Sequence, residues 1–550
     1  MDMKALYVLS FFLYNDRVTA ARGLQAAFSM PVRGNAPAEA CSPLARCQKP
    51  KPFAGAFRRQ NRRLQKALGR AGKSMRAKRE AGKGGRNLRS LRGAQGGCTL
   101  FRRDGRPCTL PPPRRKNEVK QLKLSFYTLG CKVNQNETGA LAELFCQNGF
   151  SLAREGEAAD VYLVNSCTVT AGGDKKSRQW LRRAKRLHPG AVTVLAGCYP
   201  QAFPEEAAAV AEADIVMGAK GRRRVLENVL SFLQTHERIV DIAPHEKGEA
   251  FEELPLERFE GHTRAFMKIE DGCNRRCAYC VIPRARGYVR SRSEENILKE
   301  LAVLAGAGYK EVVFSGINLS SYGQDTGTTL AALCEKAAGV PGIERIRLGS
   351  LEPDLMDDES IRRMAAVPQM CPQFHLSLQS GCTETLRRMR RVYTARQYAE
   401  VAEKLRAAFP RAVFTTDVIV GFPGETQAEF EESMAFVRKV GFLKVHVFSY
   451  SRREGTPAYD MPGQVDEHTK ALRSHALQAA ADEVRAQVIS AMAGTEAEVL
   501  LEREVANGIF TGYTKEYVPV RMRAPGRRTG DIVRAVLGAF DGARCAARPV

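Results

Sequence analysis

The chain has 550 residues, more than one hydrophobic core usually organises, so we expect roughly two to four domains. Its apolar fraction of 44% is ordinary for a globular protein, and no run approaches the roughly 18–20 apolar residues of a membrane-spanning helix, which argues against an integral membrane protein. Residues 1–120 hold 28 of the 85 basic residues but 6 of the 60 acidic ones, so most of the net charge of +25 lies there and RNA binding elsewhere must use local patches.

The basic segment 1–120 is rich in Arg, Lys, Gly and Ala and ends in the run Pro111–Lys116. Such a composition buries too little surface to offset the entropy of ordering, so we expect a disordered extension. It is interpreted either as an RNA-binding arm or as an inert or non-native upstream segment, and the second interpretation is favoured. A short apolar run, Ala5–Tyr14, resembles the apolar part of a signal peptide but has weak flanks.

Strand-like and helical stretches alternate through 121–235, which predicts a parallel α/β domain followed by a polar linker to about residue 260. The expected strands are Leu122–Leu129, Val161–Asn165, Val192–Ala196 and Ile215–Met217. The expected helices are Glu137–Asn148, Lys175–Leu187, Pro204–Glu212 and Arg223–Leu233.

The same alternation continues through 259–490, where six strands predict a partial (β/α)6 barrel because a full barrel needs eight. The expected strands are Ala265–Ile269, Glu311–Phe314, Arg345–Leu348, Gln373–Leu378, Val413–Val420 and Lys444–Phe448. A long helix near Thr469–Ile489 is expected to connect this barrel to a small all-β module at 491–550.

Three cysteines of the first domain, Cys131, Cys167 and Cys198, each stand at or just after the end of a predicted strand. The carboxyl ends of parallel strands share one sheet edge, so we expect the three thiols to converge. Buried structural cysteines are the alternative. Three thiolates suit a [4Fe–4S] cluster with one open iron better than zinc, since no nearby His offers a fourth ligand.

Cys273, Cys277 and Cys280 form a CxxxCxxC motif that follows a predicted strand, with Tyr279 before the last cysteine. This spacing resembles the radical S-adenosylmethionine (SAM) motif, in which the free iron of a second [4Fe–4S] cluster binds SAM. A zinc knuckle or a ferredoxin-like cluster is the alternative.

Two three-cysteine sites in this order, followed by a small β module, resemble the radical SAM methylthiotransferase family over about 121–540. The resemblance implies an N-terminal methylthiotransferase domain, a radical SAM domain and an RNA-binding TRAM domain. Four segments resemble the branch that acts on N6-threonylcarbamoyladenosine in tRNA: Thr128–Gln135, Leu376–Cys382, Gly421–Thr426 and His446–Arg452. Asn136, Arg284 and Asn318 depart from the family pattern and put only fine substrate geometry in doubt.

The resemblance implies two uses of SAM. One molecule methylates a sulfur at the first cluster, and another, at the CxxxCxxC cluster, yields the radical that activates carbon two of the adenine. The catalytic residues are then Cys273, Cys277 and Cys280. The implied partners are tRNA, an electron donor such as flavodoxin or ferredoxin, and a sulfur source, in a cytoplasmic enzyme.

Candidate SAM contacts come from the expected carboxyl ends of the barrel strands and from the motif itself. They are Tyr279, Gly316, Asn318, Glu352, Gln379, Ser380 and Asp417, although each also fits a turn or capping role. Arg452 and Arg453 are expected to meet the substrate carboxylate or a tRNA phosphate, or else to be solvated.

In the β module, aromatic residues are expected either to stack on bases or to fill the barrel core, and arginines to contact phosphate or to be solvated. The aromatic residues are Phe510, Tyr513 and Tyr517, and the arginines are Arg521, Arg523, Arg527 and Arg528.

Two other readings of the whole chain stay open at this point. The same chemistry on isopentenyladenosine in tRNA, or on a ribosomal protein, is the first. A non-catalytic iron–sulfur protein that binds RNA or transfers electrons is the second.

Overall fold

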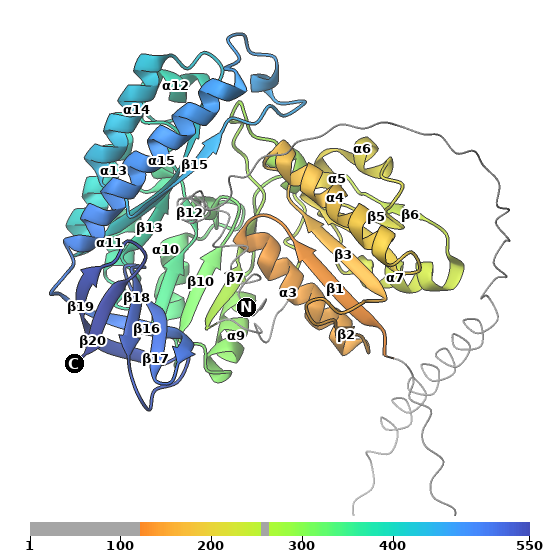
Figure 1. Cartoon of the computed structure of the whole chain (residues 1–550), viewed down its shortest axis with the longest axis horizontal. Coiled ribbons are helices and arrows are strands. Elements are labelled where there is room, and N and C mark those ends of the chain that lie inside the picture. Colours follow the sequence, from red (N-terminus) through yellow and green to blue (C-terminus); the bar gives the residue numbers. More distant parts are fainter. Residues whose placement is uncertain (1–120, 255–262) are drawn as a thin grey trace, which may run out of the picture. The chain divides into compact units, whose positions relative to one another are not determined.

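The computed structural model describes residues 121–254 and 263–550 (Figure 1), so the expected disordered extension 1–120 lies outside the described residues. Within the described part, no helix has both the length and the apolar character that a membrane crossing needs. The predicted α/β fold class, with a small closed β-barrel at the C-terminus, is confirmed.

The first domain is a six-stranded sheet in which every neighbouring pair is parallel, in the order β2-β1-β3-β4-β5-β6. Its strands are β1 (Lys123–Thr128), β2 (Ser151–Leu152), β3 (Val161–Ser166), β4 (Val192–Gly197), β5 (Ile215–Met217) and β6 (Ile239–Asp241). Strands β2 and β6 were not among the predicted ones, and β6 lies in the segment expected to be a polar linker. The sheet therefore continues past residue 235.

Helices cover both faces of this sheet, which explains why β3 and β4 are buried along their whole length. One hydrophobic core joins α3 and α7 to one face, and another joins α4 and α5 to the other. The helices are α3 (Lys132–Gln147), α4 (Ala171–Leu187), α5 (Cys198–Ala202), α6 (Pro204–Ala208) and α7 (Arg224–Thr235).

The second domain is an open parallel barrel built from two sheets, in the orders β11-β10-β7 and β12-β13-β14-β15. A single bridge between Ile346 and Met370 joins them. The strands are β7 (Arg264–Lys268), β10 (Glu311–Ser315), β11 (Arg345–Leu348), β12 (Ser350–Leu351), β13 (Gln373–Leu376), β14 (Val413–Val420) and β15 (Lys444–Ser449). A short antiparallel pair, β8 (Glu270–Asp271) and β9 (Arg290–Ser291), brackets the CxxxCxxC loop and helix α8 (Ile282–Arg286).

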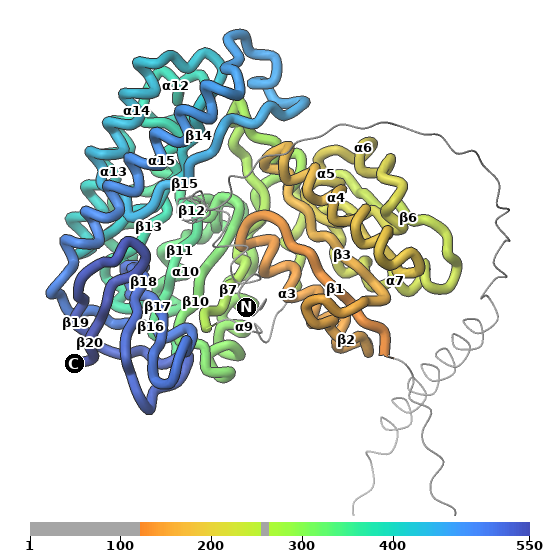
Figure 2. The backbone as a smooth tube through the Cα atoms, in the orientation of Figure 1, coloured from red at the N-terminus to blue at the C-terminus, as the bar shows by residue number. Residues whose placement is uncertain are grey.

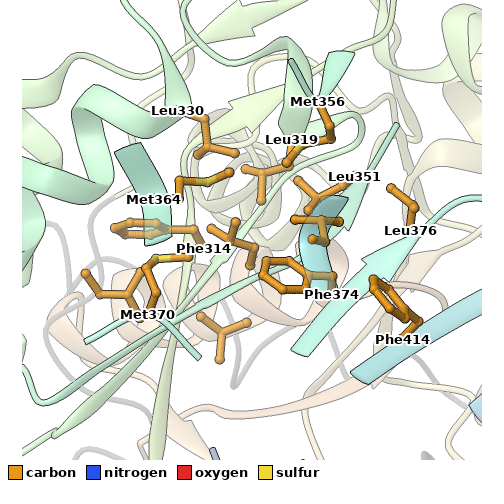
Figure 3. Close-up of a cluster of buried hydrophobic side chains, with 14 of the residues drawn as sticks. Phe314, Leu319, Leu330, Leu351, Met356, Met364, Met370, Phe374, Leu376 and Phe414 are labelled. Atoms are coloured by element: carbon orange, nitrogen blue, oxygen red, sulfur yellow. The ribbon is translucent and has the colours of Figure 1, made fainter. Parts of the chain in front are cut away.

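Helices cover the outer face of the barrel, and Figure 2 traces the strand–helix alternation through it. They are α9 (Glu294–Gly306), α10 (Leu330–Ala338), α11 (Asp358–Ala365), α12 (Thr383–Arg388), α13 (Ala395–Ala408), α14 (Gln427–Val440) and α15 (Glu467–Ser490). Figure 3 shows Phe314, Phe374, Leu376 and Phe414 in the core between strands and helices. Because side chains alternate along a strand, the neighbours of these residues face the inside of the barrel.

The C-terminal module is a closed five-stranded barrel in the order β16-β17-β18-β20-β19. Its strands are β16 (Glu496–Ala506), β17 (Ile509–Thr514), β18 (Pro519–Arg523), β19 (Ile532–Phe540) and β20 (Cys545–Pro549). Phe510 fills its core, as one of the two interpretations held. Arg521, Arg523, Arg527 and Arg528 are exposed.

The other two aromatic residues of the module neither fill the barrel core nor stay open for stacking on RNA bases. Tyr513 and Tyr517 stack on each other with ring centroids 4.5 Å apart. The guanidinium of Arg264 lies 5.3 and 5.0 Å from their ring centroids, and that of Arg347 lies 4.9 Å from Tyr517. These tyrosines therefore pack against the first strands of the parallel barrel and are engaged with cations, which corrects the expectation that they stack on RNA bases.

Glu311 anchors the strands of the parallel barrel next to this interface. Its carboxylate, 1% exposed, lies 2.7 Å from Arg347 and 3.5 Å from Arg345, and both arginines also donate to backbone carbonyls of the C-terminal module. Burial alone would raise the pKa of Glu311, but Arg347, Arg264 and Arg345 outweigh it and lower the pKa to about 2.

We predict that Glu311→Gln destabilises the protein by about 3–5 kcal/mol, because it leaves buried arginines without their anion. Thermal unfolding at neutral pH measures the loss. Glu344→Gln is the control, since Glu344 forms an exposed pair with Lys310 and should change stability by less than about 1 kcal/mol. Because the folded-state pKa is depressed, the difference from wild type should shrink as the pH falls below 4.5. Equal effects of the two substitutions would contradict the prediction.

Candidate functional site

The three cysteines of the first domain occupy equivalent places on neighbouring strands. Cys131 follows β1 and caps α3, Cys167 follows β3, and Cys198 begins α5 directly after β4. Since these strands are parallel, all three thiols lie at one edge of the sheet, as the sequence predicts.

Asn134 lies among these cysteines and shows that they converge. Its side-chain oxygen is 3.9 Å from the sulfur of Cys131 and 4.0 Å from that of Cys198. Gly130 has a φ of +106°, and a Cβ there would lie 3.0 Å from the sulfur of Cys167. The glycine therefore allows the Cys131 loop to approach Cys167, which another residue would prevent.

Burial perturbs two of the three thiols. Burial, together with the neighbouring cysteines, raises the pKa of the Cys167 thiol to about 12, and burial raises the pKa of Cys198 as well. Described cysteines form no disulfide. Because Cys131, Cys167 and Cys198 converge at one sheet edge without forming a disulfide, these three cysteines (the auxiliary triad) are a candidate metal centre.

Arg286 connects the auxiliary triad to the radical SAM motif. It is fully buried at the end of α8, six residues after Cys280, and its Nε donates to the sulfur of Cys198 at 3.1 Å. Its Nη2 donates to Asn134 at 2.6 Å and its Nη1 to Glu137 at 2.6 Å. One guanidinium from the second domain thus holds a ligand sulfur and the residue between the thiols.

Glu137 is the anion at the centre of this network. Its carboxylate is 1% exposed and lies 3.0 Å or less from Arg222, Lys268 and Arg286. Burial would raise the pKa of Glu137, but the three cations outweigh it and lower the pKa. The cations come from both domains, so the carboxylate fixes the two domains against each other.

The second triad (the radical triad: Cys273, Cys277 and Cys280) lies on the loop between β8 and α8. Burial raises the pKa of Cys273 to about 11 and that of Cys280 to about 12. Arg391 donates to the sulfur of Cys277 at 3.2 Å. The side-chain amide nitrogen of Asn318 lies 3.9 Å from the sulfur of Cys273. Positive hydrogen-bond donors on ligand sulfurs are typical of anionic clusters.

The donor set of both triads suits iron–sulfur clusters. In the described part of the chain, the group of three metal-ligating side chains whose donor atoms all lie within 4.8 Å of one another is His375, Asp417 and His446. Neither cysteine triad meets that spacing, and it is the set of three thiolates, with no fourth protein ligand, that suits an iron–sulfur cluster with one open iron.

The polar atoms beside Cys273 fit SAM. Asn318 Oδ1 and Glu270 Oε1 are buried acceptors without a hydrogen-bond partner among the described residues. The backbone N–H of Asn318 donates to the other oxygen of Glu270 at 2.8 Å, and a Cβ on Gly316 would lie 2.5 Å from it. The ammonium of SAM would donate the hydrogen bond that each of these acceptors lacks.

The other sequence-predicted SAM contacts occupy different environments. Glu352, after β12, is ion-paired with Arg391, and burial raises its pKa. Gln379 has a φ of +68°, and its backbone N–H donates to the carbonyl of Asp417. Ser380 is buried, and the ring of Tyr279 packs edge-on against that of Phe422. Asp417 lies in the middle of β14 and not at its carboxyl end, because that strand runs on to Val420. It therefore faces the barrel interior.

The structure corrects the expectation for Arg453 but not that for Arg452. Arg453 is buried and pairs with Asp174 at 2.6 Å and Thr168 at 2.7 Å, so it ties the second domain to the first. Arg452 donates to the carbonyl of Tyr459 at 2.8 Å and covers its ring. The guanidinium of Arg453 is therefore not free to meet a substrate carboxylate, whereas Arg452 is exposed, which fits the solvated alternative.

Sequence reasoning missed four polar residues of the site: Arg286, Arg391, Glu137 and Glu270. Glu270 carried a signal, since it stands between the apolar run Ala265–Ile269 and the CxxxCxxC motif. The others stand in charge-rich segments where nothing distinguishes a buried partner from a solvated one.

The comparisons with known proteins agree with this geometry. Residues 267–437 match the model of the "Radical SAM superfamily", and residues 123–218 match "Uncharacterized protein family UPF0004". The threonylcarbamoyladenosine tRNA methylthiotransferase MtaB of Bacillus subtilis is 40% identical over 417 residues, which are 75% of this chain and 92% of that protein. The chain belongs to the radical SAM methylthiotransferase family.

Further relatives in this methylthiotransferase family have two kinds of name. The MtaB of Thermotoga maritima is 37% identical over 74% of this chain and 92% of its own length. A tRNA-2-methylthio-N(6)-dimethylallyladenosine synthase of Pelotomaculum thermopropionicum is 34% identical over 70% of this chain and 88% of its own length. The chain is accordingly a transferase of the radical SAM class.

We predict about eight iron atoms per chain after anaerobic reconstitution, the content of two cubane clusters. Replacing Cys131, Cys167 and Cys198 together by alanine should halve the iron content while reductive cleavage of SAM continues at the radical triad. The matched control replaces Cys146, Cys334 and Cys371, which lie outside both triads, and should keep all the iron. Iron analysis and 5′-deoxyadenosine release measure both quantities. Full iron content in the first variant would contradict the assignment.

We predict that Arg286→Lys makes the reduction potential of the auxiliary cluster more negative. Lysine keeps a charge but cannot reach Cys198, Asn134 and Glu137 together, so the reduced cluster loses a charge-assisted hydrogen bond to a ligand sulfur. Potentiometric EPR of the variant in which the radical triad is removed measures the shift. Arg290→Lys is the control, because Arg290 touches Asp271 and the backbone of Arg286 but no cysteine. A shift in the control and none in Arg286→Lys would overturn the assignment.

Proposed function

We propose that this chain transfers a methylthio group to carbon two of N6-threonylcarbamoyladenosine beside the anticodon of tRNA, using two [4Fe–4S] clusters and two molecules of SAM. The observation that carries the proposal is the pair of cysteine triads joined by the buried side chain of Arg286. The two MtaB relatives described above act, by their names, on threonylcarbamoyladenosine.

The chemistry requires cofactors because the C–H bond at carbon two of adenine is barely acidic. When bound, the clusters and SAM supply the one-electron chemistry, the sulfur and the methyl group that no side chain provides. Cys273, Cys277 and Cys280 would hold one cluster, and Cys131, Cys167 and Cys198 the other. Arg391 and Arg286 hold one ligand sulfur in each triad through a hydrogen bond.

The chain's own polar groups would orient SAM at the radical triad. Asn318 Oδ1 and Glu270 Oε1 are acceptors in need of a donor, which the SAM ammonium provides. Arg391, which pairs with Glu352, brings a cation to the same place, where it balances the negative charge of the ligand sulfurs. Gln379, Ser380, Gly316 and Tyr279 complete the proposed set.

Contact with tRNA would rest on local basic surfaces. Helix α4 presents the exposed residues Lys175, Arg183 and Arg186, and the C-terminal barrel presents Arg521, Arg523, Arg527 and Arg528. Such residues neutralise phosphates without reading sequence. An electron donor such as flavodoxin or ferredoxin, a sulfur source and a cytoplasmic location belong to the same proposal.

Nucleoside mass spectrometry tests the proposed function. We expect that the chain, expressed in a strain that lacks its own tRNA methylthiotransferases, produces 2-methylthio-N6-threonylcarbamoyladenosine in tRNA. The Cys273→Ala variant is the control and should produce none. Appearance of the 2-methylthio derivative of dimethylallyladenosine alone would assign the chain to the other substrate, and no methylthiolated nucleoside would refute the proposal.

A further inference from the structure

Three side chains that can bind a metal lie on one face of strands β13, β14 and β15. Asp417 of β14 pairs in register with His446 of β15. His375 of β13 pairs in register with Thr415, which stands two residues before Asp417 and therefore shares its face of the sheet. Phe374, which precedes His375, belongs to the core beneath the helices (Figure 3), so this face is the inner face of the barrel.

The distances within this group match those between ligands of one tetrahedral ion. One ligand atom each from His375, Asp417 and His446 lies within 4.8 Å of the other two. Nε2 of His375 lies 3.4 Å from Oδ2 of Asp417, which is longer than the usual N–H···O hydrogen bond. Two atoms that bind one tetrahedral zinc ion at about 2.0–2.1 Å lie about 3.3–3.4 Å apart. A shared ion therefore explains the spacing of this pair better than a direct hydrogen bond.

Thr415 orients one of the two imidazoles. Its hydroxyl oxygen lies 3.0 Å from Nδ1 of His375 and accepts a hydrogen bond of 3.1 Å from the side-chain amide of Gln373. Nδ1 is thereby engaged, and Nε2 is the nitrogen that faces Asp417. Histidines that bind metals almost always have such a partner on the other ring nitrogen, because it fixes the ring and its tautomer. This contact supports a metal site independently of the spacing of the three ligands.

The set of ligands selects the kind of ion. Two imidazoles and one carboxylate suit zinc, whereas magnesium and calcium prefer oxygen ligands throughout. Neighbouring ligands of an octahedral ion with bonds of about 2.1 Å lie about 3.0 Å apart, which is closer than His375 and Asp417 are. The three side chains are half-buried, so an ion can reach them from the barrel interior.

Nearby positive charges are the main argument against a cation. Lys444 and Lys132 both act electrostatically on His446. Each acts more weakly there than the carboxylate of Asp417, which is itself a ligand in this arrangement. The lysines therefore lower the affinity of the group for a cation, but they do not cancel the charge that attracts it.

We propose that His375, Asp417 and His446 bind one Zn²⁺ ion on the inner face of the barrel. The ion has three protein ligands, and its fourth position is open to water or to another oxygen ligand, as in catalytic zinc sites. None of the three residues belongs to either cysteine triad, so the zinc is additional to the iron of the two clusters. The proposal requires neither tRNA nor SAM and does not depend on the function proposed above.

The test uses the full-length protein after anaerobic reconstitution of its iron–sulfur clusters, so that the cysteines of both triads are occupied when zinc is added. Unbound zinc is removed, and the zinc and iron contents are measured together. Zinc X-ray absorption identifies the ligand atoms. The variants are His446→Ala, Asp417→Asn and Thr415→Val, and the control is His475→Ala, which changes an exposed histidine of α15. The iron content of each variant shows whether it folds.

Wild type and His475→Ala should bind one zinc ion per chain, with nitrogen and oxygen ligands at about 2.0 Å. His446→Ala and Asp417→Asn should lose the zinc and keep the iron. Thr415→Val should bind zinc about 10- to 100-fold more weakly, because it removes the partner of Nδ1 of His375. Wild type without stoichiometric zinc, zinc with sulfur ligands at about 2.3 Å, or zinc retained in full by His446→Ala overturns the proposal. So does an additional iron atom in place of the zinc.

Discussion

The arrangement of both candidate cluster sites depends on one buried guanidinium. Arg286 belongs to the radical SAM domain by sequence, yet its hydrogen bonds go to Cys198, Asn134 and Glu137 of the first domain. A fully buried arginine is tolerated only where anions and acceptors surround it, so these partners must be in place for the chain to fold. Because α8 has five residues and spans about 7.5 Å, the same constraint keeps the two triads close.

Buried ion pairs recur wherever the domains meet, and each joins segments distant in sequence. Arg453 pairs with Asp174, Lys268 pairs with Glu137, and Arg347 links Glu311 to the carbonyl of Lys515. Such pairs add little net stability but penalise any other arrangement, because a displaced partner leaves a buried charge alone. We infer that they serve to fix the geometry between the domains, which a reaction that uses two cofactor sites requires.

Much of the fold and both triads can be predicted from the sequence, since strand–helix alternation and cysteines at strand ends are local patterns. Whether a charged residue is buried or solvated cannot be predicted from these local patterns. Arg453 and Arg286 look like solvated charges until the partner from the other domain is known. Asp417 was placed at a strand end although the predicted strand, Val413–Val420, already runs three residues past it, as β14 does. Tyr513 and Tyr517 follow the pattern of exposed aromatics, but two arginines of another domain cover them.

We infer that two iron–sulfur clusters lie close together, with Arg286 between them. The most direct measurement is EPR of the fully reduced protein, compared with the summed spectra of two variants that each lack one cysteine triad. Magnetic interaction between nearby paramagnetic clusters should broaden the wild-type signal beyond that sum and shorten its relaxation. A wild-type spectrum equal to the sum, with both clusters present in full, would contradict the account.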